Sequence, residues 1–224
     1  MKRILVLAAL ALSACAPPES FRYKSYPAYP WSGLETVAVL PVWNQTRVPF
    51  DGLEFGNILA SELAKFEGVR IIRPILLGNP EFKTADDVIK FGRSIKVDAI
   101  LVCAITDYDP YNPPKIAVSV QCLRVSGRKM AGGDIDELTR SASWRKGPLA
   151  LSRNHAGNFV AQFETVYDAH EERIRREVLA YAQAQEEGDT PFQGDREFLS
   201  VQTRYFQFVS NQLINQLFFL APDA

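Results

Sequence analysis

Few residues in this chain are of the types that carry out acid–base chemistry. The chain has two histidines, His155 and His170, and its candidate pair of carboxylates is Asp107 and Asp109. Such groups serve as general acids and bases in enzymes. Here the two aspartates lie in a proline-rich segment that predicts a hairpin loop, where aspartate commonly stabilises turns. His155 falls in an expected loop, and His170 lies on the apolar stripe of an expected helix. We therefore expect neither histidine to be catalytic or to bind metal.

No motif of a known catalytic or metal-binding type adds to these residues. The sequence contains no HExxH, no Gly-x-Ser-x-Gly, no phosphate-binding loop and no CxxC pattern. These motifs place metal ligands, nucleophiles or phosphate-binding amides at the spacing that each chemistry requires. Their absence predicts that the protein is not an enzyme, and we expect no cofactor, no metal site and no small-molecule substrate.

The cysteines divide into one near the start of the chain, Cys15, and two within apolar runs, Cys103 and Cys122. A hairpin folded about Asn112 would bring Cys103 and Cys122 nearly opposite each other on neighbouring strands. In an oxidising compartment this arrangement allows a disulfide. Two reduced thiols packed in the core are the favoured alternative, because a bond directly across two strands needs unusual geometry.

The first residues have the layout of an export signal. Lys2 and Arg3 precede an apolar run over 4–12. This run is shorter than the roughly 20 apolar residues that a transmembrane helix needs. Small residues then lead to Cys15, as at the cleavage site of a signal peptide. We expect residues 1–14 to be removed.

The segment Leu12-Ser13-Ala14-Cys15 resembles the lipobox of bacterial lipoproteins. The resemblance implies cleavage before Cys15 and a diacylglycerol on its sulfur, with further acylation, for example by palmitate, making the anchor stable. The alternative is an ordinary secretory signal with a chance cysteine. Because Ala16 rather than aspartate follows the cysteine, the resemblance implies the outer membrane, facing the periplasm.

Length and charge beyond the signal are typical of a globular protein. Residues 15–224 are enough for one domain, and charged residues make up an ordinary 23% of the chain. The formal net charge of −1 gives no general basic field, so we expect no nucleic-acid partner. No later run is long and apolar enough for a transmembrane helix. We therefore expect the N-terminal lipid to hold the protein at the membrane.

Residues 15–33 predict the lipidated cysteine followed by a tether. Its prolines disfavour helix and keep the segment extended. Unlike a plain polar spacer, it carries five aromatic residues, Phe21, Tyr23, Tyr26, Tyr29 and Trp31. A semi-rigid spacer is the favoured interpretation. The alternative is that part of the segment packs on the domain or on a neighbouring subunit.

Short apolar runs that alternate with helical patterns predict an α/β fold. The expected strands lie at 35–42, 69–72, 98–106 and 116–125. Asp51 can cap a helix after the first strand, and Thr84 with Asp87 forms a weak capping-box match before another. The order β-α-β-α-β-β predicts a mixed sheet covered by helices. We expect a single domain over 34–224.

The region after Gly127 predicts mainly helix. The run 135–145 fits either a strand or a short helix, and 157–187 predicts a helical insertion. Its narrow apolar stripe has coiled-coil-like spacing and comprises Phe163, Val166, His170, Ile174, Val178 and Tyr181. A final helix is expected at about 195–219, with a wide apolar face that packs in the core. Surplus apolar surface on it would contact another subunit or a membrane.

Five runs of the chain together resemble a known domain. They are VAVLPVWNQT, GLEFGNILASEL, VRIIRP, DAILVCAITDY and IAVSVQCLRV. They resemble bacterial envelope lipoproteins that share the αβ domain of the TolB N-terminal region, CsgG, LpoB and PelC. The resemblance covers roughly residues 35–126 and the final helix. It implies a non-catalytic part in envelope assembly, such as secretion, polymer export or activation of wall synthesis.

Trp43, Tyr108 and Tyr111 are the candidate partner-binding residues. They fall in the loops after the first and third expected strands, where aromatic side chains often form recognition surfaces. The alternative is that they shield the edge of the sheet. We expect a partner that is an envelope protein or further copies of this chain.

The sequence thus predicts a lipid-anchored, non-catalytic interaction or assembly module of envelope biogenesis or secretion. The alternative is a subunit of an oligomeric outer-membrane export channel. A channel needs amphipathic strands of about 9–11 residues that cross the membrane. Because the region after Gly127 predicts mainly helix, the interaction module is favoured.

Overall fold

The computed structural model describes most of the chain beyond the tether. The described residues are 27–78, 80, 82, 84–125, 158–185 and 195–221. The predicted signal peptide and lipid-bearing Cys15 lie outside them, as do the run 135–145 and His155.

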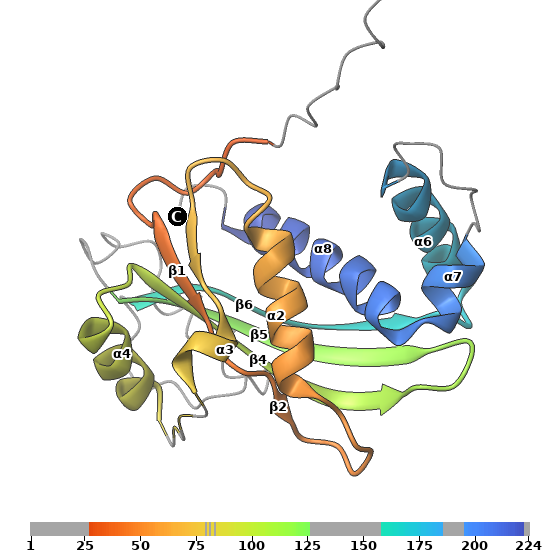
Figure 1. Cartoon of the computed structure of the whole chain (residues 1–224), viewed down its shortest axis with the longest axis horizontal. Helices are drawn as coiled ribbons and strands as arrows, with labels where there is room; N and C mark the ends of the chain where they lie inside the picture. Colours follow the sequence, from red (N-terminus) through yellow and green to blue (C-terminus); the bar gives the residue numbers. More distant parts are fainter. Residues whose placement is uncertain are drawn as a thin grey trace, which may run out of the picture.

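A mixed sheet of six strands organises the domain (Figure 1). The strands are β1 (Thr36–Val39), β2 (Trp43–Asn44), β3 (Arg70–Ile72), β4 (Ala99–Asp109), β5 (Lys115–Arg124) and β6 (Phe159–Asp168). Their order is β3-β1-β4-β5-β6, with β2 paired to β4 off this path. Pairing is parallel from β3 to β4 and antiparallel from β4 to β6. The predicted mixed α/β fold is confirmed.

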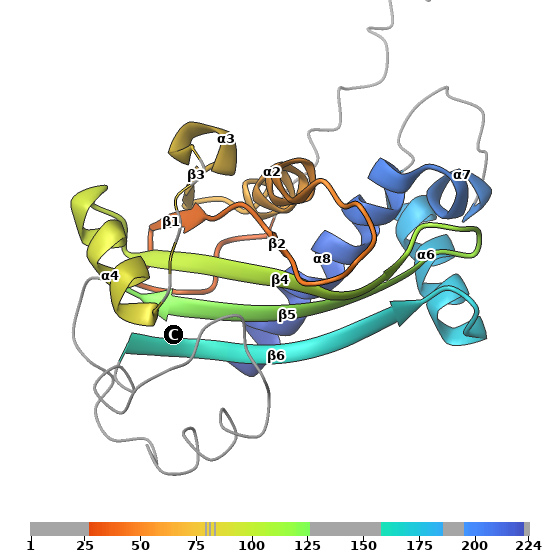
Figure 2. The same ribbon diagram turned by 90° about the horizontal axis from the view of Figure 1, so that it is seen from below.

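Helices cover both faces of this sheet. They are α2 (Gly52–Leu63), α3 (Pro74–Leu77), α4 (Ala85–Ser94), α6 (Glu172–Gln185), α7 (Asp195–Ser200) and α8 (Gln202–Leu220). The larger apolar cluster joins one sheet face to α2, α6, α7 and α8, and α2 and α8 lie side by side (Figure 2). The smaller cluster joins the other face to α4. Along β1, Val37 and Val39 point into the larger cluster and Ala38 into the smaller, as the alternation of a strand requires.

Both predicted helix caps are present. The Asp51 carboxylate accepts hydrogen bonds from the backbone N–H groups of Leu53 and Glu54, at 3.0 and 2.9 Å. At α4, the Thr84 hydroxyl accepts from the Asp87 N–H while the Asp87 carboxylate accepts from the Thr84 N–H. These side chains occupy donors that a helix start leaves without partners.

The helix predicted over 157–187 is wrong in its first half. Residues Phe159–Asp168 form β6, which pairs antiparallel with β5, and helix α6 begins only at Glu172. The segment is rich in Phe, Val, Thr and Tyr, which favour strands. Periodicity alone does not separate a short apolar strand from a helix, and pairing with the long β5 decides between them here.

The predicted final helix is confirmed, with a break. It is divided at Val201 into α7 and α8. Its apolar face is buried, and Phe206 lies in an aromatic group with Phe50, Phe55 and Tyr108, whose ring centroids lie 5.3, 5.0 and 6.3 Å from its own. This group joins α8 to α2 and to the end of β4.

The segment 27–33 belongs to the domain and not to a free spacer. The Tyr29 N–H donates to the Glu67 carbonyl, and the Glu67 N–H donates to the Pro27 carbonyl. Trp31 is buried, and its indole N–H donates to the carbonyl of Ala221 at the end of α8. The domain therefore begins before residue 34, because aromatic side chains of the expected tether fill a gap beside α8.

Replacing Phe206 by alanine tests this arrangement. Its ring is fully buried, so Phe206→Ala should lower the free energy of unfolding by about 3–5 kcal/mol. The measurement is urea-induced unfolding of residues 16–224. Phe219→Ala is the matched control on the same helix; its ring is 82% exposed, and the expected change is within about 0.5 kcal/mol. Equal effects of the two substitutions would contradict the packing described here.

Candidate functional site

The cysteine pair lies in the core, on one face of the sheet. The β4–β5 hairpin turns about Asn112, since Asp109 pairs with Lys115. A β-bulge between Ile105 and Asp107 then shifts the register by one residue, so that Cys103 pairs with Val120 and Cys122 with Leu101. The cysteines are therefore diagonal neighbours, for which Cα atoms lie roughly 7–8 Å apart.

Both thiols are free and buried. A diagonal separation exceeds the usual Cα distance of a disulfide. Burial also raises the pKa of the Cys122 thiol to about 12, and burial together with the neighbouring Cys122 raises the pKa of Cys103 further. These thiols fill apolar volume and are poor nucleophiles, because the thiolate is the reactive form.

The three aromatic candidates do not form one surface. Tyr108 is only 5% exposed and lies in the core beside Phe50, with ring centroids 5.0 Å apart, so its predicted place in an exposed loop is wrong. Trp43 forms β2 and packs partly on the smaller cluster, across the sheet. Tyr111 alone is open to solvent, with 79% of its surface exposed. The bulge in β4 turns Tyr108 inward.

The two aspartates of the hairpin have structural partners. The Asp107 carboxylate pairs with the Lys115 ammonium at 2.7 Å, which raises the pKa of that lysine. Asp109 accepts a hydrogen bond from the N–H of Tyr111, two residues along, and so stabilises the turn. The pair does not converge on a cavity.

His170 lies in the turn before α6 and not on an apolar helical stripe. Its ring is exposed, and Nδ1 lies 2.8 Å from the carboxylate of Asp168. The His170 N–H also donates to this carboxylate, and the backbone bond and the nearby ring lower the pKa of Asp168. The arrangement fixes the connection from β6 to α6.

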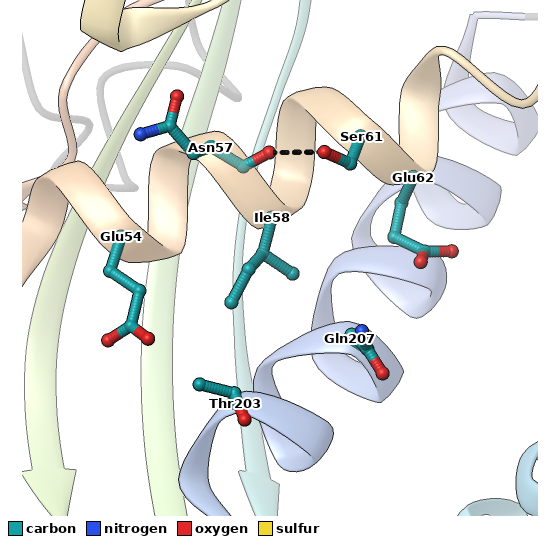
Figure 3. Close-up of a pocket in the computed structure, with 7 residues that line it drawn as sticks. All are labelled: Glu54, Asn57, Ile58, Ser61, Glu62, Thr203 and Gln207. Atoms are coloured by element: carbon teal, nitrogen blue, oxygen red, sulfur yellow. Dashed lines mark hydrogen bonds between the residues drawn. The ribbon is translucent and has the colours of Figure 1, made fainter.

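A groove of about 320 Å³ lies between α2 and α8 (Figure 3). Its lining comprises Glu54, Asn57, Ile58, Ser61, Glu62, Thr203 and Gln207. Glu54 and Glu62 are eight residues apart on α2, so their backbones are separated by about 12 Å along the helix. Ile58 lies between them and points toward α8 (Figure 3).

The groove has acidic ends and a neutral polar floor. The Ser61 hydroxyl donates a hydrogen bond to the backbone carbonyl of Asn57 at 2.8 Å, so the proton of this hydroxyl already has an acceptor. The side-chain oxygen of Asn57 is buried without a hydrogen-bond partner. The lining includes no histidine, cysteine, lysine or arginine. The groove therefore has hydrogen-bonding capacity and negative charge.

Glu62 is the least exposed residue of this lining, with 4% of its surface accessible. One carboxylate oxygen accepts a hydrogen bond from the Lys65 ammonium at 2.6 Å, and the other is buried. Burial, the Glu62 charge and a side-chain hydrogen bond with Glu62 raise the pKa of Tyr181 on α6. The Glu62 carboxylate is therefore held between Lys65 and Tyr181.

Sequence reasoning did not identify this groove. The polar residues Glu54, Asn57 and Ser61 recur at helical spacing, which was the available signal. A polar stripe is also what any surface helix presents to solvent. The groove exists because α8 packs beside this stripe. The sequence of α2 alone does not indicate which element packs against it.

A second exposed feature is the end of α8. Phe219 and Leu220 are exposed in its last turn, whereas the neighbouring Phe218 packs on Tyr29 and Trp31 with ring centroids 5.7 and 5.1 Å away. We call Phe219 and Leu220 the apolar tip. It lies at the end of the domain where the chain arrives from the predicted anchor (Figure 1).

The described residues show neither a metal cluster nor a membrane-spanning helix. Over these residues, no group of three or more His, Cys, Asp or Glu side chains is placed to hold a metal ion. No helix in the described part combines the length and apolar character needed to cross a bilayer.

Comparison with known proteins identifies no family for the chain. No family model matches it, and no curated protein matches it.

Three solved structures are similar to parts of the chain. A PelC dodecamer from Paraburkholderia phytofirmans is 21% identical over 46% of this chain and 67% of that one, with a TM-score of 0.30. Lipoprotein GNA1162 from Neisseria meningitidis is 13% identical over 67% and 95%, with a TM-score of 0.37. The hypothetical protein CT253 from Chlamydia trachomatis is 10% identical over 81% and 94%, with a TM-score of 0.39. No role is assigned to the chain on account of these similarities.

Thiol labelling tests the state of the cysteine pair. At pH 8, a pKa of about 12 leaves roughly one Cys122 thiol in ten thousand ionised. Folded residues 16–224 should therefore resist iodoacetamide at both Cys103 and Cys122. Unfolding in urea without reductant should release two reactive thiols, counted by mass. Rapid labelling of the folded protein, or no reactive thiol in urea, would contradict the free, buried pair.

Proposed function

We propose that this protein is a lipid-anchored, non-catalytic interaction module of the bacterial cell envelope. In this proposal Cys15 carries the lipid and holds the domain at the outer membrane, on its periplasmic side. The observation that carries it is the lipobox-like segment ending at Cys15, followed after a short connection by a folded domain.

The length of the connection limits where the domain works. Residues 16–26, eleven in all, separate Cys15 from Pro27, the first described residue. At about 3.5 Å per extended residue, they span at most roughly 40 Å. A domain tethered this closely meets partners that lie in or near the same membrane. The tether also raises the effective concentration of the domain there.

The chemistry of the described residues supports binding and not catalysis. The thiols are buried, His170 is paired with Asp168 on the surface, and the groove lining contains neither histidine nor cysteine. The resemblance of residues 35–126 to non-catalytic envelope lipoproteins supports the same role. A domain with these properties acts by bringing other molecules together.

We infer that the groove between α2 and α8 receives the partner. Its two carboxylates and neutral polar floor complement a protein segment with basic or hydrogen-bond-donating side chains. Glu54, at one end of the groove, would pair with a basic side chain of such a segment. The partner is then an envelope protein or another copy of this chain with a matching basic surface.

Substitution of Cys15 tests the anchor. The Cys15→Ala variant lacks the sulfur that would carry the diacylglycerol. When the full-length variant is expressed in a bacterium, it should therefore no longer be recovered in the membrane fraction that detergent extracts. Its mass should also lack the acyl increment. Cys122→Ala is the matched control, because its thiol is buried in the core. Equal membrane association and equal mass shifts in parent and Cys15→Ala would exclude the lipid anchor.

Charge reversal at the groove tests partner binding. Lipidated protein extracted in a mild detergent should have a native mass above that of the monomer, measured by light scattering. Glu54→Lys should shift this mass toward the monomer, because it places positive charge against a basic partner. Asp86→Lys is the matched control, since Asp86 lies in the first turn of α4 on the other sheet face.

The outcomes separate the proposals. A mass unaffected by Glu54→Lys would exclude the groove as the surface through which copies of this chain assemble. A discrete ring-sized oligomer that forms only in detergent would favour the alternative, a subunit of an export channel. A monomeric native mass for the parent and for both variants would contradict assembly through the groove and would also contradict a channel.

A further inference from the structure

We propose that the apolar tip of α8, Phe219 and Leu220, inserts into the surface of the bilayer that carries the lipid anchor. The occupant of this exposed patch is thus lipid. The inference rests on the proposed anchoring at Cys15 and adds a second membrane contact, which fixes how the domain stands on the membrane.

The tip is exposed, whereas the other large apolar side chains of α8 are buried or partly buried. Phe219 and Leu220 are 82% and 45% exposed, whereas Leu213, Ile214 and Leu217 are buried in the core. Ile75 and Leu76 on α3 form another exposed apolar pair, but the tip is the pair that directly follows Phe218, on which the Tyr29 and Trp31 rings pack. Burying the two side chains of the tip in a bilayer would be favourable, because their apolar surface stays in contact with water in the folded domain.

The tip lies where the tether arrives. The Tyr29 and Trp31 rings pack on Phe218, directly before the tip, and the Trp31 indole donates to the carbonyl of Ala221, directly after it. Figure 1 shows the chain reaching the domain at this end of α8. A domain pulled toward the membrane through Pro27 therefore presents this end first.

The chemistry of α8 suits a lipid surface. From Tyr205 to Leu220 the helix contains no charged residue; its one charge is Arg204, in the first turn. Helix ends leave backbone carbonyls without partners, and the bond from Trp31 satisfies the carbonyl of Ala221 at this one. The last turn of α8 therefore carries no side-chain charge, and the Ala221 carbonyl already has a donor. Neither feature opposes contact with lipid headgroups. Phe66, in the loop after α2, also packs on Phe218, with ring centroids 5.0 Å apart.

The opposite end of α8 provides an internal reference. Tyr111 is 79% exposed, nearly as much as Phe219. It adjoins Asn112, whose side-chain amide lies 3.4 Å from the Ser200 hydroxyl, just before α8. The helix has 19 residues, so its two ends lie about 28 Å apart. An insertion of the tip leaves Tyr111 in water.

Spin labels at these two positions test the proposal. Full-length protein, with its lipid first confirmed by mass, is reconstituted in phosphatidylethanolamine–phosphatidylglycerol vesicles. Nitroxides are attached to Phe219→Cys and, separately, to Tyr111→Cys; the native Cys103 and Cys122 are buried. Collision with lipid-soluble oxygen and with a water-soluble nickel chelate then reports the depth of each label. Leu220→Cys is a second label at the tip, and thermal unfolding checks that each variant is folded.

The expected result is a higher ratio of oxygen to nickel collisions at 219 and 220 than at 111. Equal, water-like ratios at all three positions would overturn the proposal. A label at 219 shielded from both reagents would also overturn it, and would show that protein covers the tip. Because lipidation is verified beforehand, failure of the tip to insert is distinguishable from failure of the anchor. In the otherwise native lipidated chain, Phe219→Ser with Leu220→Ser should speed transfer between vesicles by about tenfold or more.

Discussion

One extra residue in β4 sets the direction of the side chains on which the domain depends. The bulge between Ile105 and Asp107 changes the register with β5 by one position, and in a strand such a change exchanges the two faces. On one side of the bulge Cys103 faces the larger core cluster together with Cys122. On the other side Tyr108 turns into the same core, where it meets the aromatic group that holds α8 against α2.

Local signals in the sequence were sufficient for much of the fold. Asp51 and Thr84 cap helices through contacts within three residues, so their roles can be read without tertiary structure. The segment Phe159–Asp168 was misassigned because its state depends on β5, a partner distant in sequence. Tyr108 was misplaced because a bulge leaves no clear local mark. The groove escaped prediction since it is formed by two helices that meet only in the folded chain.

Two groups that could react have structural roles. Cys122 is buried in the core, and Asp107 pairs with Lys115. Polar side chains such as Glu54 and Gln207 instead line a groove on the surface. The groove lies along the first half of α8, whereas the apolar tip is its last turn, so in the proposed lipid-anchored protein contact with one need not block the other.

The bond between Trp31 and the end of α8 has a mechanical consequence. In the proposed lipid-anchored protein, tension on the connection to the membrane would enter the domain through Pro27 and reach Trp31 before β1. The indole and its aromatic neighbours would transfer that load to the end of a long helix packed in the core. The strands of the sheet would then not be the first elements to separate under load.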